Sequence, residues 1–422
     1  MNRARKTILV VGTYDTKFDE LRFLGDCIEH QDGATLTMDV SVLGEPVGSV
    51  SVNKHEVAAA AGSSIEDAVA ADDENEAMQI MARGAAALTA KLYREGRIDG
   101  MIAIGGTMGT DLALDCARAL PIGVPKYIIS TVAFSPLIPA NRLSADIQMI
   151  LWAGGLYGLN SICKSSLSQG AGAVLGAARA IVPPQAARPV VGMTSFGSSC
   201  LAYMKWLKPE LEQRGFEVAI FHATGMGGMA FESIAAEGGF AAVMDFAPQE
   251  LGNWMFGSAV NSGPDRLLSA GCSGIPQIVA PGCMDLIDFV GSQELPPRFA
   301  NRQFHAHNRL IKSSVLNAEE RRETAREIGK RLSQSKGPVH FLLPARGLEE
   351  WDKEGGPTHD PEGLAAFLDE ISKSIMAPVR LSEIDAHIND KAFSDQALAV
   401  FDAWVADGTI KGPVRESRGE VA

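Results

Sequence analysis

Residues 98–111 read IDGMIAIGGTMGTD, and this stretch decides the class of fold. The apolar run Met101–Ile104 predicts a buried strand, and the glycines that follow it predict a tight turn. The helical pattern LALDCARAL comes next, at residues 112–120. A strand, a glycine loop and a helix in this order present backbone N–H groups at a helix N-terminus, which attracts anions. The stretch therefore predicts a phosphate-bearing ligand.

Five residues of the loop are candidate phosphate ligands. We expect the amides of Gly105, Gly106 and Gly109 to approach the phosphate closely. Thr107 and Thr110 add hydroxyl groups that can donate to it. The loop matches neither a P-loop, because it lacks the lysine of GxxxxGK[ST], nor GxGxxG. A tight turn without a ligand is the alternative interpretation.

The composition sets bounds on size and partners. At 422 residues the chain fits two domains, and its 46% apolar and 21% charged residues are typical of a compact globular protein. A net charge of −13 argues against non-specific binding to nucleic acid, which depends on Lys and Arg. The chain has no apolar stretch of the roughly 18 residues that a membrane span needs, so we expect no membrane partner.

The cysteines and the first residues indicate a cytoplasmic protein. The six cysteines are scattered without a CxxC pair, which argues against a zinc knuckle or a disulfide framework and suits a reducing compartment. The start of the chain is basic, but its apolar run is too short for a signal peptide and predicts a first strand instead.

Strands alternate with helices along nearly the whole chain, which predicts an α/β protein with parallel sheets covered by helices on both faces. The stretch VPPQAARP, Val182–Pro189, breaks both patterns and is the expected linker. We therefore predict two doubly wound, Rossmann-like domains at residues 1–183 and 188–422. The expected strands are Thr7–Gly12, Ala34–Val42, Met101–Ile104, Lys126–Ala133, Val190–Phe196, Glu217–His222, Phe240–Phe246, Gln277–Pro281, Pro338–Pro344 and Val379–Ile384. The expected helices include Phe18–Gln31, Gly155–Ala180, Ala318–Gln334, Pro361–Ile375 and Lys391–Ala406.

Further loops at the carboxyl ends of strands are candidates, because ligands of open α/β sheets bind there. In GTYDTK, Gly12 and Thr13 border the ligand, and Asp15 can hold a hydroxyl, a phosphate or a hydrated metal. A helix cap is the alternative for this loop. Thr131, near the end of the strand expected at Lys126–Ala133, is a further candidate for the same phosphate site.

The loop HATGMGG, residues 222–228, repeats this chemistry in the second domain. His222 is the candidate general acid or base, and a hydrogen-bonded structural histidine is the alternative. Thr224, Gly225 and Gly227 are expected to face the ligand. We expect the ligand to lie between the two domains.

Two histidine-containing segments lie further along the chain. In DAHIND, Asp385 and His387 are expected to support His222 in catalysis. In FHAHN, His305 and His307 are two residues apart and would face the same way on an extended segment. The spacing matches no known zinc site, so a divalent metal that accompanies a phosphate is the form of metal binding that we consider.

Several ordered motifs give the chain a family resemblance: VGTYDTKFDEL, IAIGGTMGTDLA, LPIGVPK with STVA, FHATGMGG, GPDRL, HAHN, LPARG and DAHIND. In this order they resemble uncharacterised protein family 0261, also called the ATP-binding domain family of the tomato mosaic virus resistance protein. The resemblance spans Ile8 to about Ala406 and implies two Rossmann-like domains, ATP binding and a homodimer. Met108 stands where the loop of the family usually has a glycine.

The leading hypothesis is a cytoplasmic protein that binds ATP, with or without magnesium, and has a metabolic role. One alternative is a lyase or hydrolase that acts on a small phosphorylated or carboxylated metabolite. Another is a regulatory module that binds a protein partner through the segment 44–75.

Overall fold

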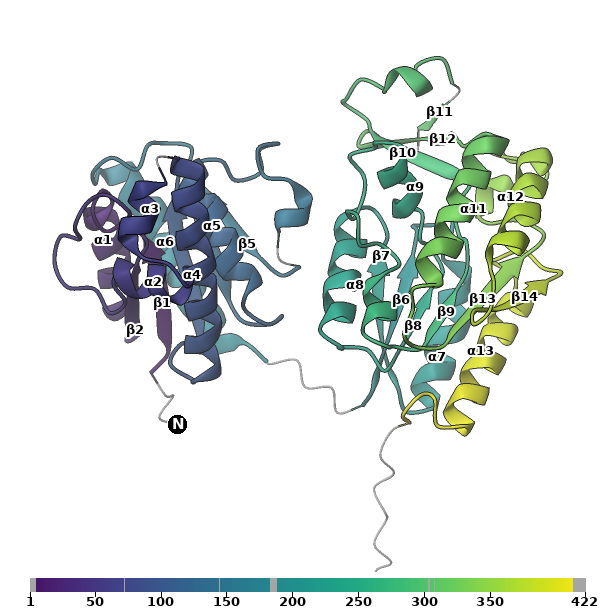
Figure 1. Ribbon diagram of the computed structural model, residues 1–422, viewed down its shortest axis with the longest axis horizontal. Helices are drawn as coiled ribbons and strands as arrows, with labels where there is room; N and C mark the ends of the chain where they lie inside the picture. Colours follow the sequence, from purple (N-terminus) through teal and green to yellow (C-terminus); the bar gives the residue numbers. More distant parts are fainter. Residues whose placement is uncertain are drawn as a thin grey trace, which may run out of the picture. The chain divides into compact units, whose positions relative to one another are not determined.

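A computed structural model describes residues 5–71, 73–143, 145–182, 188–302, 304–306 and 308–412. His307 and most of the expected linker lie outside these residues. The chain divides into two compact units, Met1–Gln185 and Ala186–Ala422, which are described separately (Figure 1). In the described ranges, no helix is long and apolar enough to cross a membrane.

The N-terminal unit contains a five-stranded parallel sheet in the order β2-β1-β3-β4-β5. Its strand order reverses between β1 and β3, so the carboxyl ends of these two strands flank the topological switch point. The strands are β1 (Thr7–Gly12), β2 (Ala34–Asp39), β3 (Gly100–Gly105), β4 (Lys126–Ser130) and β5 (Gln148–Leu151).

Helices cover both faces of this sheet (Figure 1). Residues of β1 alternate between them: Ile8 packs on the face of α1 and α6, and Leu9 packs on the face of α2, α4 and α5. Burial on both faces explains why β1 and β3 are continuous apolar runs. The helices are α1 (Phe18–Glu29), α2 (Lys54–Ala60), α3 (Ile65–Ala70), α4 (Glu74–Arg94), α5 (Thr107–Arg118) and α6 (Ser161–Ala180), with the short η1 (Ala140–Arg142).

The long helix expected from Gly155 begins only at Ser161. The side chain of Asn160 accepts hydrogen bonds from the amides of Ile162 (3.1 Å) and Cys163 (2.9 Å) and so caps the helix. The small residues before Asn160 therefore form a loop.

Close packing between β3 and α5 requires glycine at position 105. A Cβ there would lie 2.6 Å from the carbonyl carbon of Gly109 and 2.8 Å from the nitrogen of Thr110, which are backbone atoms. We expect Gly105→Ala to lower the free energy of unfolding by about 2 kcal/mol in urea titrations. Gly106→Ala is the matched control, because its nearest contact is Thr131 Oγ1 at 3.8 Å. Equal stability of the two variants would contradict the close approach.

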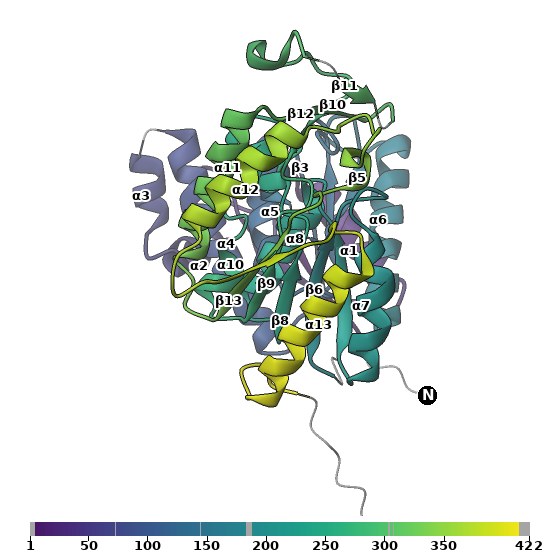
Figure 2. The ribbon, with the colours of Figure 1, turned by 90° about the vertical axis from the view of Figure 1, so that its right-hand side faces the viewer.

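The C-terminal unit contains a six-stranded parallel sheet in the order β14-β13-β9-β8-β6-β7. Helices α7 and α13 pack on one face, and α8, α11 and α12 pack on the other (Figure 2). The expected fold class, two Rossmann-like parallel-sheet domains, is confirmed. The strands are β6 (Val190–Ser195), β7 (Glu217–His222), β8 (Ala242–Asp245), β9 (Gln277–Val279), β13 (Val339–Pro344) and β14 (Arg380–Ile384). The helices are α7 (Ala202–Gln213), α8 (Met226–Ala236), α9 (Glu250–Met255), α10 (Ser269–Cys272), α11 (Ala318–Leu332), α12 (Pro361–Ser374) and α13 (Lys391–Ala406), with the short η2 (Pro297–Phe299) and η3 (Glu350–Asp352).

A small antiparallel sheet, β10-β12-β11, was not predicted. It is inserted between β9 and α11 and lies at one end of the unit (Figures 1 and 2). Because β10 begins seven residues after β9 ends, the sheet lies near the carboxyl edge of the six-stranded sheet. Its strands are β10 (Leu286–Val290), β11 (Phe304–Ala306) and β12 (Ile311–Val315).

Candidate functional site

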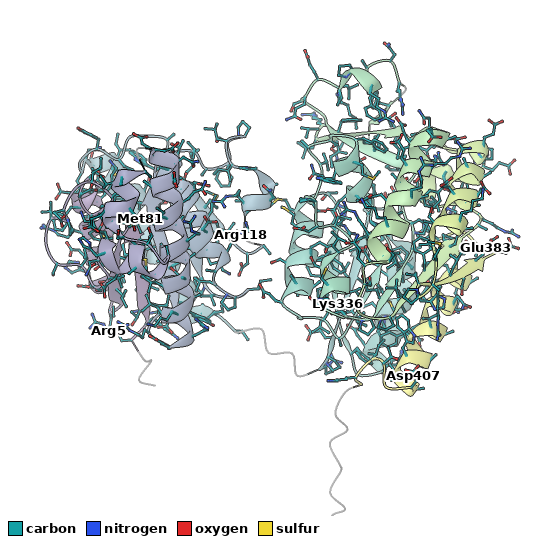
Figure 3. The ribbon with its side chains drawn as sticks, in the orientation of Figure 1. Arg5, Met81, Arg118, Lys336, Glu383 and Asp407 are labelled. Carbon is teal, nitrogen blue, oxygen red and sulfur yellow. The ribbon has the colours of Figure 1, made fainter. Side chains whose placement is uncertain are left out.

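A pocket of about 540 Å³ opens beside the switch point of the N-terminal unit. Three groups of residues form it: the loop after β1, the segment after β2 with α3 and α4, and the first turns of α5. Met81, labelled in Figure 3, contributes to the apolar wall from α4. The lining residues are Thr13, Asp15, Thr16, Val40, Ser41, Val42, Leu43, Ala68, Val69, Asp73, Glu74, Ala77, Met78, Met81, Met108, Gly109 and Leu112.

The N-terminus of α5 borders this pocket through Met108 and Gly109. Gly106 is the N-cap and provides no side chain to cap the helix. The first helical hydrogen bond runs from the Thr110 amide to the Gly106 carbonyl, at 2.9 Å. The amides of residues 107–109 precede that bond and have no partner within the helix, so they can receive an anion.

Thr110 does not face the pocket. Its side chain is buried, and its hydroxyl lies 2.7 Å from the Ser130 hydroxyl and 3.4 Å from the Gly105 carbonyl oxygen. The amide of Thr131 also donates to Gly105, at 3.2 Å. We therefore correct the expected role of Thr110: it fixes the loop against β4, and Thr107 provides the exposed hydroxyl.

Asp15 and Asp39 converge on one serine beside the pocket. The Asp15 carboxylate accepts from the Ser41 hydroxyl (2.9 Å) and from the Gly44 amide (3.2 Å). Asp39, at the end of β2, accepts from Ser41 and from the Tyr14 amide (3.1 Å). Its second oxygen, Oδ2, is buried and has no hydrogen-bond partner among the described residues. The loop after β1 and the end of β2 therefore each contribute one carboxylate here, of which only Asp15 was predicted.

The remaining candidates of this loop lie at the same edge. The hydroxyls of Thr13 and Thr16 lie 3.0 Å apart. The carbonyl of Gly12 accepts from the amide of Val40 at 3.0 Å, which joins the loops after β1 and β2. The structure thus brings Gly12, Thr13 and Asp15 together with the segment Val40–Leu43, which the sequence did not indicate as part of a site.

The glycine loop of the C-terminal unit already holds an anion. The amides of Gly225 and Gly228 donate to Glu250 Oε1, at 2.5 and 3.1 Å. A Cβ at Gly228 would lie 1.8 Å from Glu250 Oε2, so glycine is needed for this close approach. The HATGMGG loop therefore has the predicted anion-binding character, but a carboxylate of the protein occupies it.

Glu250 belongs to a buried ion network at the switch point between β6 and β8. Arg266 Nε lies 3.0 Å from Glu250, and its terminal nitrogens bind Asp245 and Glu232. All four side chains are buried. Burial raises the pKa of Glu250 to about 7, although the charge of Arg266 and the two amides act in the opposite direction. Gly225 therefore has a structural role, because its amide donates to Glu250. Gly227 is needed for close packing, because a Cβ there would lie 1.8 Å from the His222 carbonyl oxygen.

The structure does not unite the three candidate catalytic residues. His222 ends β7, and Asp385 follows β14, on the opposite edge of the six-stranded sheet. Five intervals of about 4.8 Å separate these strands by about 24 Å. The expected support of His222 by Asp385 is therefore wrong. His222 is exposed and accepts a hydrogen bond from the Gly197 amide through Nδ1, at 3.3 Å. Thr224 follows it in a turn in which its own amide donates to the His222 carbonyl, at 2.9 Å.

Asp385 and His387 have different partners. Asp385 is exposed and forms a two-point ion pair with Arg346, at 2.5 and 2.7 Å. His387 is buried, and its Nδ1 accepts from the Asn389 amide at 3.0 Å. Nε2 therefore carries the proton and donates to the Glu349 carbonyl, at 2.9 Å. Burial opposes the charged form of His387, but the hydrogen bond and the charge of Asp352, together with the Glu349 carbonyl, raise the pKa overall.

In the part of the chain that the structure describes, no three His, Cys, Asp or Glu side chains are grouped so that they could hold a metal ion. Any metal at the N-terminal pocket would therefore need ligands from a bound molecule, as Mg²⁺ commonly takes from phosphates.

Comparison with known proteins supports a family assignment for both units. The model described as "Uncharacterised protein family (UPF0261) N-terminal domain" matches residues 6–183, and the corresponding C-terminal domain model matches residues 188–405. A UPF0261 protein of Brucella melitensis is 53% identical over 408 residues, which cover 96% of this chain and 98% of that protein. A UPF0261 protein of Clostridium tetani is 34% identical, with 92% and 96% covered.

More distant similarities reach a plant protein and solved structures. The ToMV susceptible protein tm-1(GCR26) of Solanum lycopersicum is 27% identical over 417 residues, which cover 93% of this chain and 55% of that protein. The E. coli ADP-heptose lps heptosyltransferase II covers 72% of this chain at 9% identity, with 92% of its own chain aligned and a TM-score of 0.20. That score is too low to support any argument about function. The two domain models and the relatives of full length show that the chain belongs to the family UPF0261.

Proposed function

We propose that the N-terminal unit binds a nucleotide, ATP together with magnesium, in the pocket beside α5. One observation carries the proposal: a pocket of about 540 Å³ combines an uncapped helix N-terminus with an apolar wall at the switch point of the sheet. Ligands of doubly wound sheets bind at such points. The family resemblance supports ATP as the nucleotide.

Each part of a nucleotide has a matching surface. The phosphates lie at the amides of residues 107–109, where the dipole of α5 favours negative charge. The base packs against Met78, Met81 and Leu112. Glu74, at the start of α4, accepts hydrogen bonds from the sugar hydroxyls. This arrangement keeps the phosphates apart from that carboxylate.

The residues present also fit a magnesium ion that arrives with the nucleotide. Mg²⁺ is usually held by one or two carboxylates together with phosphate oxygens and waters. Asp15 and Asp39 would provide the carboxylates, and the unpartnered Oδ2 of Asp39 is an oxygen that such a hydrated ion would satisfy. We expect nucleotide binding to weaken when magnesium is removed with a chelator.

A charge placed on α5 tests the proposal. Met108 is 47% exposed, so Met108→Glu leaves the core intact, and an acidic residue in the first turn favours the helix. The same charge repels phosphate, and we expect ATP to bind at least tenfold more weakly, a loss of about 1.4 kcal/mol. Isothermal titration of the full chain with ATP and magnesium measures the effect.

Met108→Gln is the matched control, because it has the same shape without the charge, and we expect its affinity to stay close to that of the wild type. Equal affinity of the Glu and Gln variants would place the phosphates elsewhere. If the wild-type chain binds no nucleotide below millimolar concentration, the proposal is wrong.

The wider role follows from the same proposal. We propose a cytoplasmic homodimer with a metabolic function, in which the N-terminal unit binds the nucleotide and the protein acts on a second substrate. The lyase or hydrolase alternative is favoured by one observation in the C-terminal unit, a polar pocket of about 290 Å³ beside two buried carboxyl groups, Glu349 and Asp285. The segment 44–75, considered above as a surface for a protein partner, contributes Ala68, Val69, Asp73 and Glu74 to the nucleotide pocket.

A further inference from the structure

A second polar pocket lies in the C-terminal unit, beside the antiparallel sheet. Its volume is about 290 Å³, and it is open to solvent. At about 30 Å³ for each water molecule in the liquid, it has room for a ligand of about ten non-hydrogen atoms. Hydroxyl groups, an imidazole and a guanidinium contribute its polar surface. The lining residues are Arg302, Phe304, His305, Ser313, Ser314, Val315, Pro357 and Thr358.

Thr358 connects this pocket with a buried carboxyl group. Its hydroxyl is hydrogen bonded to Glu349 Oε1. The other oxygen, Glu349 Oε2, accepts from the Trp351 amide at 2.7 Å. Glu349 is fully buried. Thr358 therefore lines the pocket and also contacts the buried carboxyl group of Glu349.

A second buried carboxyl, Asp285, lies close enough to Glu349 for their charges to interact. Asp285 is 1% exposed, and neither of its carboxyl oxygens has a hydrogen-bond partner among the described residues. Its backbone carbonyl accepts from the Leu316 amide at 2.8 Å, which places Asp285 directly beside the end of β12 and the pocket residue Val315. A buried carboxyl without partners is rare and costly, so its presence points to a function.

The two carboxyl groups are surrounded by charges of both signs. Burial and, to a smaller extent, the charge of Asp285 together raise the pKa of Glu349 to about 9. Burial likewise raises the pKa of Asp285 to about 7, against the charge of Arg321 on α11. Three other groups interact electrostatically with Glu349 or Asp285: Asp352 on η3, Asp360 before α12 and the buried thiol of Cys283. His387 donates a hydrogen bond to the Glu349 carbonyl.

Protonation of Glu349 sets the direction of the hydrogen bond to the pocket. Because Oε2 accepts from the Trp351 amide, a proton on Glu349 resides on Oε1, next to Thr358. Neutral Glu349 then donates to the Thr358 hydroxyl, and that hydroxyl is left to donate into the pocket. When Glu349 is ionised, the Thr358 hydroxyl donates to it and is no longer available to a ligand.

We propose that this pocket binds a small carboxylic acid, whose carboxylate accepts a hydrogen bond from Thr358, with Glu349 and Asp285 behind it as a proton reservoir. His305 and Arg302 in the lining provide donors for the same anion. Arg302 already donates to Glu320, at 2.6 and 2.8 Å, so much of its charge is balanced. That balance favours a monoanionic carboxylate over a phosphate dianion.

Binding of lactate and glycolate, which are both monoanions, to the full chain tests the proposal by saturation-transfer nuclear magnetic resonance at pH 7.5 and 9.5. We expect the wild type to bind at pH 7.5 and to lose about fourfold in affinity at pH 9.5, as Glu349, with its pKa of about 9, ionises. Thr358→Val removes the donor and is expected to weaken binding tenfold at pH 7.5. Thr358→Ser restores the hydroxyl and is expected to restore binding.

Glu349→Gln separates proton control from packing. Its amide donates to Thr358 at every pH, so we expect binding at pH 7.5 to persist and the loss at pH 9.5 to disappear. Glu383→Gln is the control, because Glu383 is exposed on the edge strand β14 (Figure 3). The proposal is overturned if neither acid shows saturation transfer, or if Thr358→Val binds as the wild type does. It is also overturned if Glu349→Gln keeps the loss at pH 9.5.

Discussion

Replacing Arg266 with methionine is expected to destabilise the C-terminal unit by about 4 kcal/mol, within the range for breaking a buried ion pair. Arg266 is fully buried and is the shared partner of Asp245, Glu232 and Glu250. Methionine fills a similar volume but leaves the three carboxylates without their counter-charge. Urea unfolding of the full chain at pH 8 measures the loss.

The pH dependence identifies the cause. Burial raises the pKa values of Glu232 and Glu250, so both carboxyls become neutral as the pH is lowered. We therefore expect the destabilisation by Arg266→Met to shrink between pH 8 and pH 5. Lys391→Met, which removes an exposed ion pair with Asp395, is the control and is expected to have little effect. A loss below 1 kcal/mol for Arg266→Met, or one that does not change with pH, would contradict this explanation.

The ion network also explains why the two glycine loops differ. Both follow a parallel strand and begin a helix, and both expose amides at the helix start. In the C-terminal unit these amides donate to Glu250, which Arg266 holds in place. In the N-terminal unit the corresponding amides border a pocket. A phosphate can therefore reach the loop at Gly106, whereas Glu250 would have to move before one reached Gly225.

Most strands of the two parallel sheets could be predicted from the sequence because parallel strands buried on both faces are continuous apolar runs, but the partly exposed edge strand β5 was missed. β1 and β7 begin and end at the expected residues, Thr7–Gly12 and Glu217–His222. The antiparallel sheet was missed because the three residues of β11 are too few to show a period. The other outer strand of this sheet, β10, reads as another apolar run, LIDFV.

The candidate site could be predicted from the sequence only where backbone amides form it. The glycines after β3 indicated an anion site, since their pattern is local in sequence. The apolar wall from α4 has the same periodicity as any core helix, so Met78 and Met81 gave no signal of a ligand. The role of Thr110 was misjudged and that of Glu250 was overlooked, because their hydrogen-bond partners are distant in sequence. Asp285 did leave a signal, as an acidic residue inside the buried run MDLI.

Asp285→Asn is expected to stabilise the protein at pH 8, an unusual outcome for a substitution of a fully buried residue. Burial raises the pKa of Asp285 to about 7 from an ordinary value of 3.8. The folded state therefore binds more protons than the unfolded state between about pH 4 and pH 7. Stability consequently falls as the pH rises through this window. Each pKa unit corresponds to about 1.4 kcal/mol, so the wild type loses about 4 kcal/mol through this group.

Asparagine has nearly the same shape and cannot ionise, so the variant lacks this loss. We expect its free energy of unfolding to match that of the wild type near pH 4 and to exceed it by about 4 kcal/mol at pH 8. Urea titrations at both pH values measure the difference, and Glu383→Gln, which changes an exposed carboxylate, should follow the wild type throughout. A variant less stable than the wild type at pH 8 would show that the Asp285 carboxylate is compensated within the fold. The expected gain means that the wild type retains a destabilising carboxyl beside the polar pocket, and a binding function is the reason that the structure offers for retaining it.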